Sequence, residues 1–252
     1  LPVYVENAAE FLTTGNKRFT AKSVLIYSSV SGNTKEMIEL VDKVKAIGAR
    51  VFAFIDTPGS ILTAEDKQDY LVVYKMNEQL KFYMTANYLM YKNGEFPEYE
   101  RYNREMEEYL AEALISTEKE ADVWAYEYAR KKAAYLKEHP EMPHYFIGCG
   151  NQYGATYSYA MCYWEEQMWI RTKSISAPEF FHGMQEIITA DTPVTLFVGE
   201  DEQRPLAERV ARFLPKVCAN YTIIDTKEFE LKGISEEFRG SISHHVMRAV
   251  NA

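Results

Sequence analysis

The chain has 252 residues and a formal net charge of −9, from 37 acidic and 28 basic side chains. This balance argues against a nucleic-acid-binding protein, because such proteins usually present a basic face. Apolar residues make up 47% of the chain, so a sizeable core is expected and global disorder is excluded. The length suits one large domain or two medium ones.

The chain has three cysteines, Cys149, Cys162 and Cys218. Their odd number and lack of paired spacing argue against a disulfide framework, which favours a cytoplasmic, reducing location. No CxxC or HExxH motif is present, so we expect neither a metal nor another cofactor. No apolar run approaches the roughly 18 residues of a membrane span, so no membrane partner is expected.

The first part of the chain has the pattern of an α/β unit. Residues 3–5 are typical of a short strand, and the continuous apolar run at 23–28 predicts a buried parallel strand. Apolar residues at helical spacing then predict a helix that ends at Gly48. Further strands are predicted at 50–55 and 70–74, which makes a βαβ unit with a parallel sheet.

The middle of the chain, rich in Tyr, Glu, Lys and Ala, carries no strand signal. It predicts three helices, near 77–92, 97–115 and 118–138. Thr117 and Glu120 have the spacing of a capping box, so we expect the third helix to begin there. The prolines within 139–143 then break the helical pattern and mark a domain boundary.

Beyond that boundary the α/β pattern resumes. Helices are predicted at 153–169, 204–214 and 236–250, and strands at 144–148, 173–176, 192–199 and 221–225. We therefore expect a first domain at 1–92, a helical connector at 93–140 and a second domain at 141–252. The chain begins on a strand-like run and ends in an uncapped helix. We expect an N-terminal part of the first domain and a C-terminal tail of the second to be missing.

A hydroxyl-rich loop, Ser28–Thr34, follows the first long strand and precedes a helix. In an open parallel sheet this turn lies at the carboxyl ends of the strands, where ligands bind. Backbone N–H groups and the helix dipole attract an anion there, and Ser29, Ser31 and Thr34 add donors. The loop lacks the GxxxxGK[ST] motif, so it suits a monoester phosphate better than a nucleotide. Simple capping of the helix is the alternative.

The corresponding loop of the second domain, Gly148–Gly154, resembles GxGxxG only loosely. No acidic residue ends the next strand, so dinucleotide binding is not expected. Gly150 and Tyr153 of this loop are candidate substrate contacts. Cys149 is a weak candidate nucleophile. The need for a small side chain at a tight turn would explain a cysteine at this position equally well.

Glu166 is the strongest catalytic candidate. The predicted helix around it is apolar on two opposite faces, so we expect both faces to be buried, with Glu166 in the middle of one of them. A carboxylate there is costly unless it is paired, protonated or used, which predicts a raised pKa and acid–base work. A surface glutamate and a structural ion pair are the alternatives. His182 follows sixteen residues later and shares the segment Pro178–Gly183 with Glu179, a third candidate substrate contact.

The pattern S-x-S-G-x-T at Ser29–Thr34 resembles the phosphate loop of sugar isomerase (SIS) domains. Residues 146–187 and 199–214 are similar to the second SIS domain of the glucosamine-6-phosphate synthase isomerase module. They are more similar still to fructosamine-6-phosphate deglycases. The resemblance covers nearly the whole chain. It implies two SIS-type, three-layer αβα units with parallel sheets, the first incomplete, joined by a helical block.

By the same resemblance, Glu166 and His182 match the family's catalytic pair, and Ser29, Ser31 and Thr34 match its phosphate-binding hydroxyls. The resemblance implies a homodimer with the active site at the subunit interface and no cofactor. The implied activity cleaves fructosamine 6-phosphates to glucose 6-phosphate and a free amino acid. A phosphosugar aldose–ketose isomerase and a non-catalytic sugar-phosphate-binding module are the alternatives. The chain departs from the family in carrying Met184 after His182-Gly183, where proline is commoner.

Overall fold

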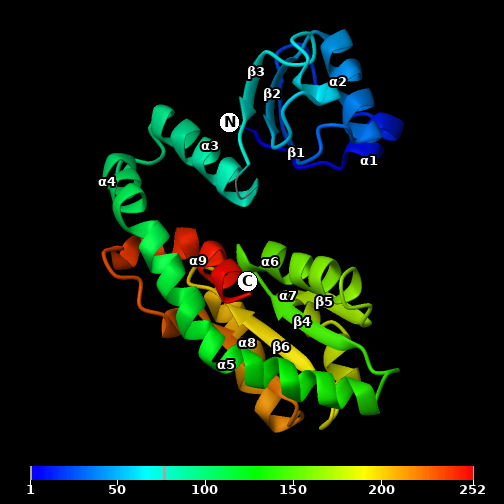
Figure 1. Cartoon of the computed structure of the whole chain (residues 1–252), viewed down its shortest axis with the longest axis vertical. Helices are drawn as coiled ribbons and strands as arrows, with labels where there is room; N and C mark the ends of the chain where they lie inside the picture. The colour runs from blue at the N-terminus through cyan, green and yellow to red at the C-terminus, as the bar shows by residue number, and fades with distance from the viewer. Residues whose placement is uncertain (1, 76–77, 252) are drawn as a thin grey trace. The chain divides into compact units, whose positions relative to one another are not determined.

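The structure, a computed structural model, describes residues 2–75 and 78–251, which form two compact units, Leu1–Phe96 and Pro97–Ala252 (Figure 1). The α/β class and the parallel sheets expected from the sequence are confirmed in both units. Among the described residues, no helix is both long enough and apolar enough to cross a membrane.

The first unit holds a parallel sheet in the order β1-β2-β3, formed by β1 (Val24–Ser29), β2 (Arg50–Ile55) and β3 (Tyr70–Val73). Helices α1 (Ala8–Thr14) and α2 (Lys35–Ile47) pack on one face. The core there includes Tyr27, Leu40, Val41, Val44 and Ile55. Helix α3 (Glu78–Lys92) packs on the other face, where the rings of Phe82 and Phe54 lie 6.0 Å apart.

At the start of the first unit, two details differ from the sequence prediction. A third, the cap of α2, agrees with it. Residues 3–5 form no strand, and helix α1 was not predicted. Asn7 caps α1 by accepting a hydrogen bond from the Ala9 N–H at 2.9 Å, a signal that the sequence reading passed over. The predicted cap of α2 is confirmed, because Gly48 is left-handed at φ +84° and donates to the Lys45 carbonyl.

The second unit holds a parallel sheet in the order β5-β4-β6-β7. Its strands are β4 (His144–Gly148), β5 (Thr172–Ser176), β6 (Val194–Val198) and β7 (Tyr221–Asp225). Helices α7 (Ala177–Phe180) and α8 (Arg204–Phe213) cover one face, where Phe180, Val210 and Leu214 join the core. Helix α6 (Gln152–Ser158), its π-helical continuation (Tyr159–Glu165), α5 (Ala111–Glu138) and α9 (Glu236–Val250) lie on the opposite side.

The predicted helix break near Thr117 is wrong. Helix α4 (Tyr99–Glu105), a π-helical turn (Met106–Leu110) and α5 follow one another without interruption. Thr117 lies inside α5 and donates its hydroxyl proton to the Ala113 carbonyl at 3.0 Å, instead of capping a new helix. A threonine can make this bond four residues back, so a capping-box pattern does not by itself start a helix.

Helix α9 is buried on most of its surface. His244 and His245 are both buried, as is His144 at the start of β4. The Nε2 of His144 lies 2.8 Å from the Thr195 hydroxyl, and its ring stacks on Phe146. Burial holds the pKa of all three histidines below the usual value, to about 4 for His245.

The buried histidines predict a fold that loses stability in mild acid. They stay neutral in the folded state, whereas each binds a proton in the unfolded chain near pH 6.5. Below that pH the unfolded state holds more protons, so the free energy of unfolding falls as pH falls and is unaffected above neutrality. The shift of the His245 pKa to about 4 corresponds to about 3 kcal/mol once the pH is below 4.

Urea denaturation at pH 7.5, 6.0 and 5.0 measures this loss. We expect the midpoint to fall at each step, and more steeply below pH 6. Replacing the exposed His139 with Asn serves as the control and is expected to leave the profile unchanged. A midpoint that stays constant from pH 7.5 to 5.0 contradicts the prediction.

Candidate functional site

The hydroxyl-rich loop after β1 is shaped by its own side chains. Ser29 Oγ accepts a hydrogen bond from the Gly32 N–H at 3.1 Å, and Ser31 Oγ accepts one from the Asn33 N–H at 3.2 Å. Each hydroxyl uses a lone pair inside the loop, and its proton is left to donate elsewhere. Thr34 occupies the N-cap position of α2, but its side chain makes no capping bond. The three hydroxyls are therefore not consumed by helix capping.

A second loop, which follows β2, supports the first. Gly32 is buried with φ +62°, and a Cβ built on it would lie 2.0 Å from Ser60 Oγ. The Gly32 carbonyl accepts from the Leu62 N–H at 3.0 Å, and Asn33 Oδ1 accepts from the Ile61 N–H at 2.9 Å. These contacts require glycine at position 32 and hold the loop in one conformation before any ligand arrives.

The same edge of the first sheet carries an ion pair that the sequence analysis did not identify. Asp56, the residue after β2, pairs with Lys81 of α3, and the Lys81 side chain is almost completely buried. The Asp56 N–H also donates to the Ser29 carbonyl at 3.3 Å. A polar residue directly after a parallel strand is the signal that could have drawn attention to Asp56.

The corresponding loop in the second unit is occupied by the protein's own side chains. The Gly150 N–H donates to Gln203 Oε1 at 3.1 Å, and the Asn151 N–H donates to Asp201 Oδ2 at 2.8 Å. Gly150 has φ +58°, and a Cβ there would lie 2.4 Å from both carboxylate oxygens of Asp201. The Asp201 carboxylate thus fills the position that an anionic ligand would need. The Gly150 N–H already donates its hydrogen bond to Gln203, so it is not free to bind a ligand.

The remaining contact and nucleophile candidates of the second unit differ in their surroundings. Burial raises the pKa of the Cys149 thiol to about 11, so the thiolate that a nucleophile requires is scarce near neutral pH. Tyr153 is exposed on α6, and Glu179 is exposed on α7. Both are accessible from solvent, and their role as substrate contacts stays a prediction.

Glu166 is exposed, so the prediction that both faces of its helix are buried is wrong for the single chain. One face is buried, along residues that recur every four positions: Gln152, Thr156, Ala160 and Trp164. The opposite face is exposed. A π-helix has a wider turn than an α-helix, so residues four apart stay nearly in line. The outer face was expected to be buried because it is apolar, and apolar composition does not decide which face of a helix packs inside its own chain.

His182 is also exposed. It lies within the turn after α7, where its N–H donates to the Glu179 carbonyl at 2.9 Å. Gly183, at φ +143°, then redirects the chain into a short 3₁₀ helix. The three hydroxyl candidates share one loop of the first unit, and all the other candidates belong to the second unit.

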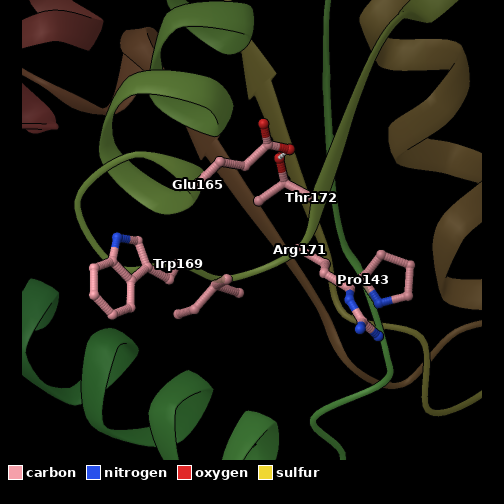
Figure 2. A pocket seen from close by; sticks show the side chains of 6 residues that line it. Pro143, Glu165, Trp169, Arg171 and Thr172 are labelled. Atoms are coloured by element: carbon pink, nitrogen blue, oxygen red, sulfur yellow. Dashed lines mark hydrogen bonds between the residues drawn. The ribbon is translucent and has the colours of Figure 1, made fainter.

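A shallow hollow of about 500 Å³ lies where the Glu166 helix ends. Its lining comprises Pro143, Glu165, Trp169, Ile170, Arg171 and Thr172. Figure 2 shows Glu165 directed at Thr172, whose hydroxyl donates to the carboxylate at 2.6 Å, and the indole of Trp169 at the left of the view, away from Arg171 and Pro143.

Trp169 is unusual in two respects. It has φ +57°, the only positive φ of a non-glycine residue within 2–75 and 78–251, and its side chain is 90% exposed. A bulky residue in the left-handed region is strained, and such strain is found most often at functional positions. Trp169 belongs to the helix for which we expected both faces to be buried, and no role was predicted for it. Throughout the described part of the chain, no group of three or more His, Cys, Asp or Glu could hold a metal.

The sequence is similar to two curated proteins along nearly its whole length. It is 29% identical over 252 residues to the fructosamine deglycase FrlB of Bacillus subtilis, covering 97% of this chain and 74% of that protein. It is 27% identical over 247 residues to a glutamine–fructose-6-phosphate aminotransferase (isomerizing) of Clostridium acetobutylicum, covering 95% of this chain and 38% of that protein. No protein-family model matches the chain.

Solved structures that match the fold of this chain belong to similar kinds of protein. A Bacillus subtilis crystal structure, provisionally assigned as a phosphosugar isomerase, matches with a TM-score of 0.79 at 25% identity and covers 97% of this chain and 75% of that one. The C-terminal domain of a Francisella tularensis glucosamine-fructose-6-phosphate aminotransferase matches with a TM-score of 0.73 at 14% identity. It covers all of this chain and 74% of that domain. The resemblance to SIS-type phosphosugar isomerases and deglycases is thereby confirmed.

Proposed function

We propose that this chain, similar to a fructosamine deglycase over 97% of its length, is a deglycase of fructosamine 6-phosphates. That similarity is the observation that carries the proposal. The comparisons support an enzyme of the sugar isomerase family in general, and the deglycase activity is our choice within it. The preformed hydroxyl loop adds support, because it suits a single monoester phosphate.

In the proposed reaction the loop orients the substrate. The protons of Ser29, Ser31 and Thr34, with the N-terminal N–H groups of α2, bind the phosphate. Glu166 removes a proton from carbon 1 of the ring-opened substrate and returns one to carbon 2, through an enolamine. Water then hydrolyses the imine at carbon 1, which releases glucose 6-phosphate and the amino acid. His182 assists ring opening or protonates the enolic oxygen.

The proposal requires that Glu166 be shielded from water during the reaction, because a desolvated carboxylate is the better base. The single chain leaves it exposed. We therefore propose a homodimer in which the second chain covers Glu166 and the active site lies at the subunit interface. Its cellular location is proposed to be the cytoplasm, where sugar phosphates are found.

A phosphosugar aldose–ketose isomerase is the second candidate. The match to a structure provisionally assigned as a phosphosugar isomerase favours it. It needs the same phosphate loop and the same base but no imine hydrolysis. A non-catalytic binding module is disfavoured, because Glu166 and His182 are both present.

The deciding experiment offers the purified protein fructosamine 6-phosphates with different amino acids and couples glucose 6-phosphate release to a dehydrogenase. We expect release from at least one substrate. We also expect the Ser31→Ala and Thr34→Val double variant to raise KM with a smaller change in kcat, since the loop binds rather than reacts. Interconversion of fructose 6-phosphate and glucose 6-phosphate without any amine release would select the isomerase.

A further inference from the structure

The ion pair of Asp56 and Lys81 lies beside the hydroxyl loop and takes no part in the proposed reaction. Both side chains are buried: 1% of the Lys81 side chain and 9% of the Asp56 side chain are exposed. Asp56 directly follows β2, and Lys81 lies in the first turn of α3. Both residues belong to the first unit, as does the hydroxyl loop, so one compact body holds the pair and the loop.

Two hydrogen bonds join the segment that starts at Asp56 to the hydroxyl loop. The Asp56 N–H donates to the Ser29 carbonyl at 3.3 Å, directly after the pairing of Ile55 with Ser29 in the sheet. The Thr57 hydroxyl donates to the Val30 carbonyl at 2.8 Å. Neighbouring strands lie about 4.8 Å apart, which is less than the roughly 8 Å over which physiological salt screens a charge. A net charge beside Asp56 therefore acts on an anion that the loop holds.

The sign of that charge depends on the pair being complete. An unpaired carboxylate at position 56 would repel a phosphate dianion, and an unpaired ammonium at position 81 would attract it. Both effects are stronger at a buried position than in bulk water, because the effective dielectric constant is lower there. The complete pair has no net charge, so it leaves the phosphate to the hydroxyls and N–H groups of the loop.

We propose that Lys81 is a positioning residue for the phosphate site, which neutralises and fixes Asp56 so that this edge of the sheet accepts a phosphate dianion. Lys81 acts through Asp56 and not on the ligand, because its ammonium group is covered and already donates to the carboxylate. Asp56 in turn supplies the counter-charge that a buried ammonium requires. The inference rests on the proposed function, in which the hydroxyl loop binds a phosphate.

A purely structural ion pair is the competing explanation, because the same contact fastens α3 to the end of β2. The two explanations differ in the sign of their effects. If the pair only fastens the helix, the loss of either partner loosens the same contact and weakens phosphate binding alike. If it neutralises charge beside the ligand, removing Lys81 leaves a negative charge and removing Asp56 leaves a positive one, so the two affinities change in opposite directions.

Titration with inorganic phosphate, followed by phosphorus NMR at pH 8 and constant ionic strength, measures these signs. We expect Lys81→Met to raise the dissociation constant of phosphate by about fivefold or more, and Asp56→Asn to lower it by about as much. The double variant, which lacks both charges, is expected to bind phosphate within about twofold of the parent protein.

The matched control is the ion pair of Lys45 and Asp69, whose charged atoms lie 3.3 Å apart. Asp69 directly precedes β3, so this pair lies at the amino edge of the same sheet, opposite the hydroxyl loop. Strand β2 has six residues, so the two edges are roughly 20 Å apart, more than two screening lengths. Lys45→Met and Asp69→Asn are therefore expected to leave the phosphate affinity unchanged.

Urea denaturation accompanies each titration, because removing one partner of a buried pair is destabilising. Lys81→Gln, which is also uncharged, takes the place of Lys81→Met if the latter does not fold. Weaker binding by both single variants, or no change in either, would overturn the inference and leave the phosphate loop standing. A parent protein that binds no phosphate would overturn both. A failed deglycase assay with phosphate binding intact would overturn the activity alone.

Discussion

The Glu166→Gln variant is expected to lose about 10²- to 10⁴-fold in turnover of a fructosamine 6-phosphate, the range that general acid–base catalysis contributes. Glutamine keeps the size of the side chain and can neither accept nor return the proton that moves between carbons 1 and 2. The loss should appear in kcat with little change in KM, because the phosphate loop still binds the substrate.

The fold should be unaffected, since Glu166 is exposed and surface substitutions usually change stability by less than about 0.5 kcal/mol. An unchanged melting temperature therefore separates lost chemistry from lost structure. Glu118→Gln, on the exposed side of α5, is the matched control and should keep full turnover. Turnover by Glu166→Gln at the parent rate would remove the proposed mechanism under both the deglycase and the isomerase readings.

The Arg239→Met variant is expected to lose about 3–5 kcal/mol of stability, the usual result of removing one partner of a buried ion pair. Arg239 of α9 makes two hydrogen bonds to Glu200, at 2.8 and 2.9 Å, and both side chains are buried. It also donates to the carbonyls of Thr226 and Phe229, both at 3.2 Å. The variant would leave a buried carboxylate with the Thr226 hydroxyl as its remaining neutral donor.

Urea denaturation measures the effect, and Arg130→Met is the matched control. Arg130 also pairs with a carboxylate, that of Glu127, at 2.8 Å, but both side chains are mostly exposed. Losing this exposed ion pair should lower the free energy of unfolding by less than about 1 kcal/mol. A double variant, Arg239→Met with Glu200→Leu, should recover part of the stability by removing the stranded charge. Equal losses from Arg239→Met and Arg130→Met would contradict the assignment.

The hydroxyl loop and most strands follow from local sequence. Strands β2, β4 and β7 have the bounds that the sequence predicts, because a buried parallel strand is largely apolar on both faces. The loop at 28–34 was found because a polar loop between a parallel strand and a helix lies at the carboxyl ends of the strands, where ligands bind. Its brace, Ser60, is far away in sequence, and no local pattern marks it.

The helix before Glu166 shows the limit of such reasoning. Its composition is apolar all round, and from that we expected burial all round. The structure instead buries one side and leaves Tyr157, Met161 and Trp169 exposed. An apolar side chain is unfavourable to expose to water. Its apolar character does not predict whether the same chain or a second molecule covers it.

The residue order alone therefore determined the α/β class, the parallel strands and the hydroxyl loop, because these depend on periodicity and on chemistry within a few neighbouring positions. The tertiary structure decided which face of the Glu166 helix is buried, which donors Asp201 occupies and which charges meet inside the second unit. Those outcomes depend on contacts between residues 39 to 91 positions apart, such as Arg239 with Glu200 and Gln152 with Ser243. Such contacts form only when the sheets and helices are assembled.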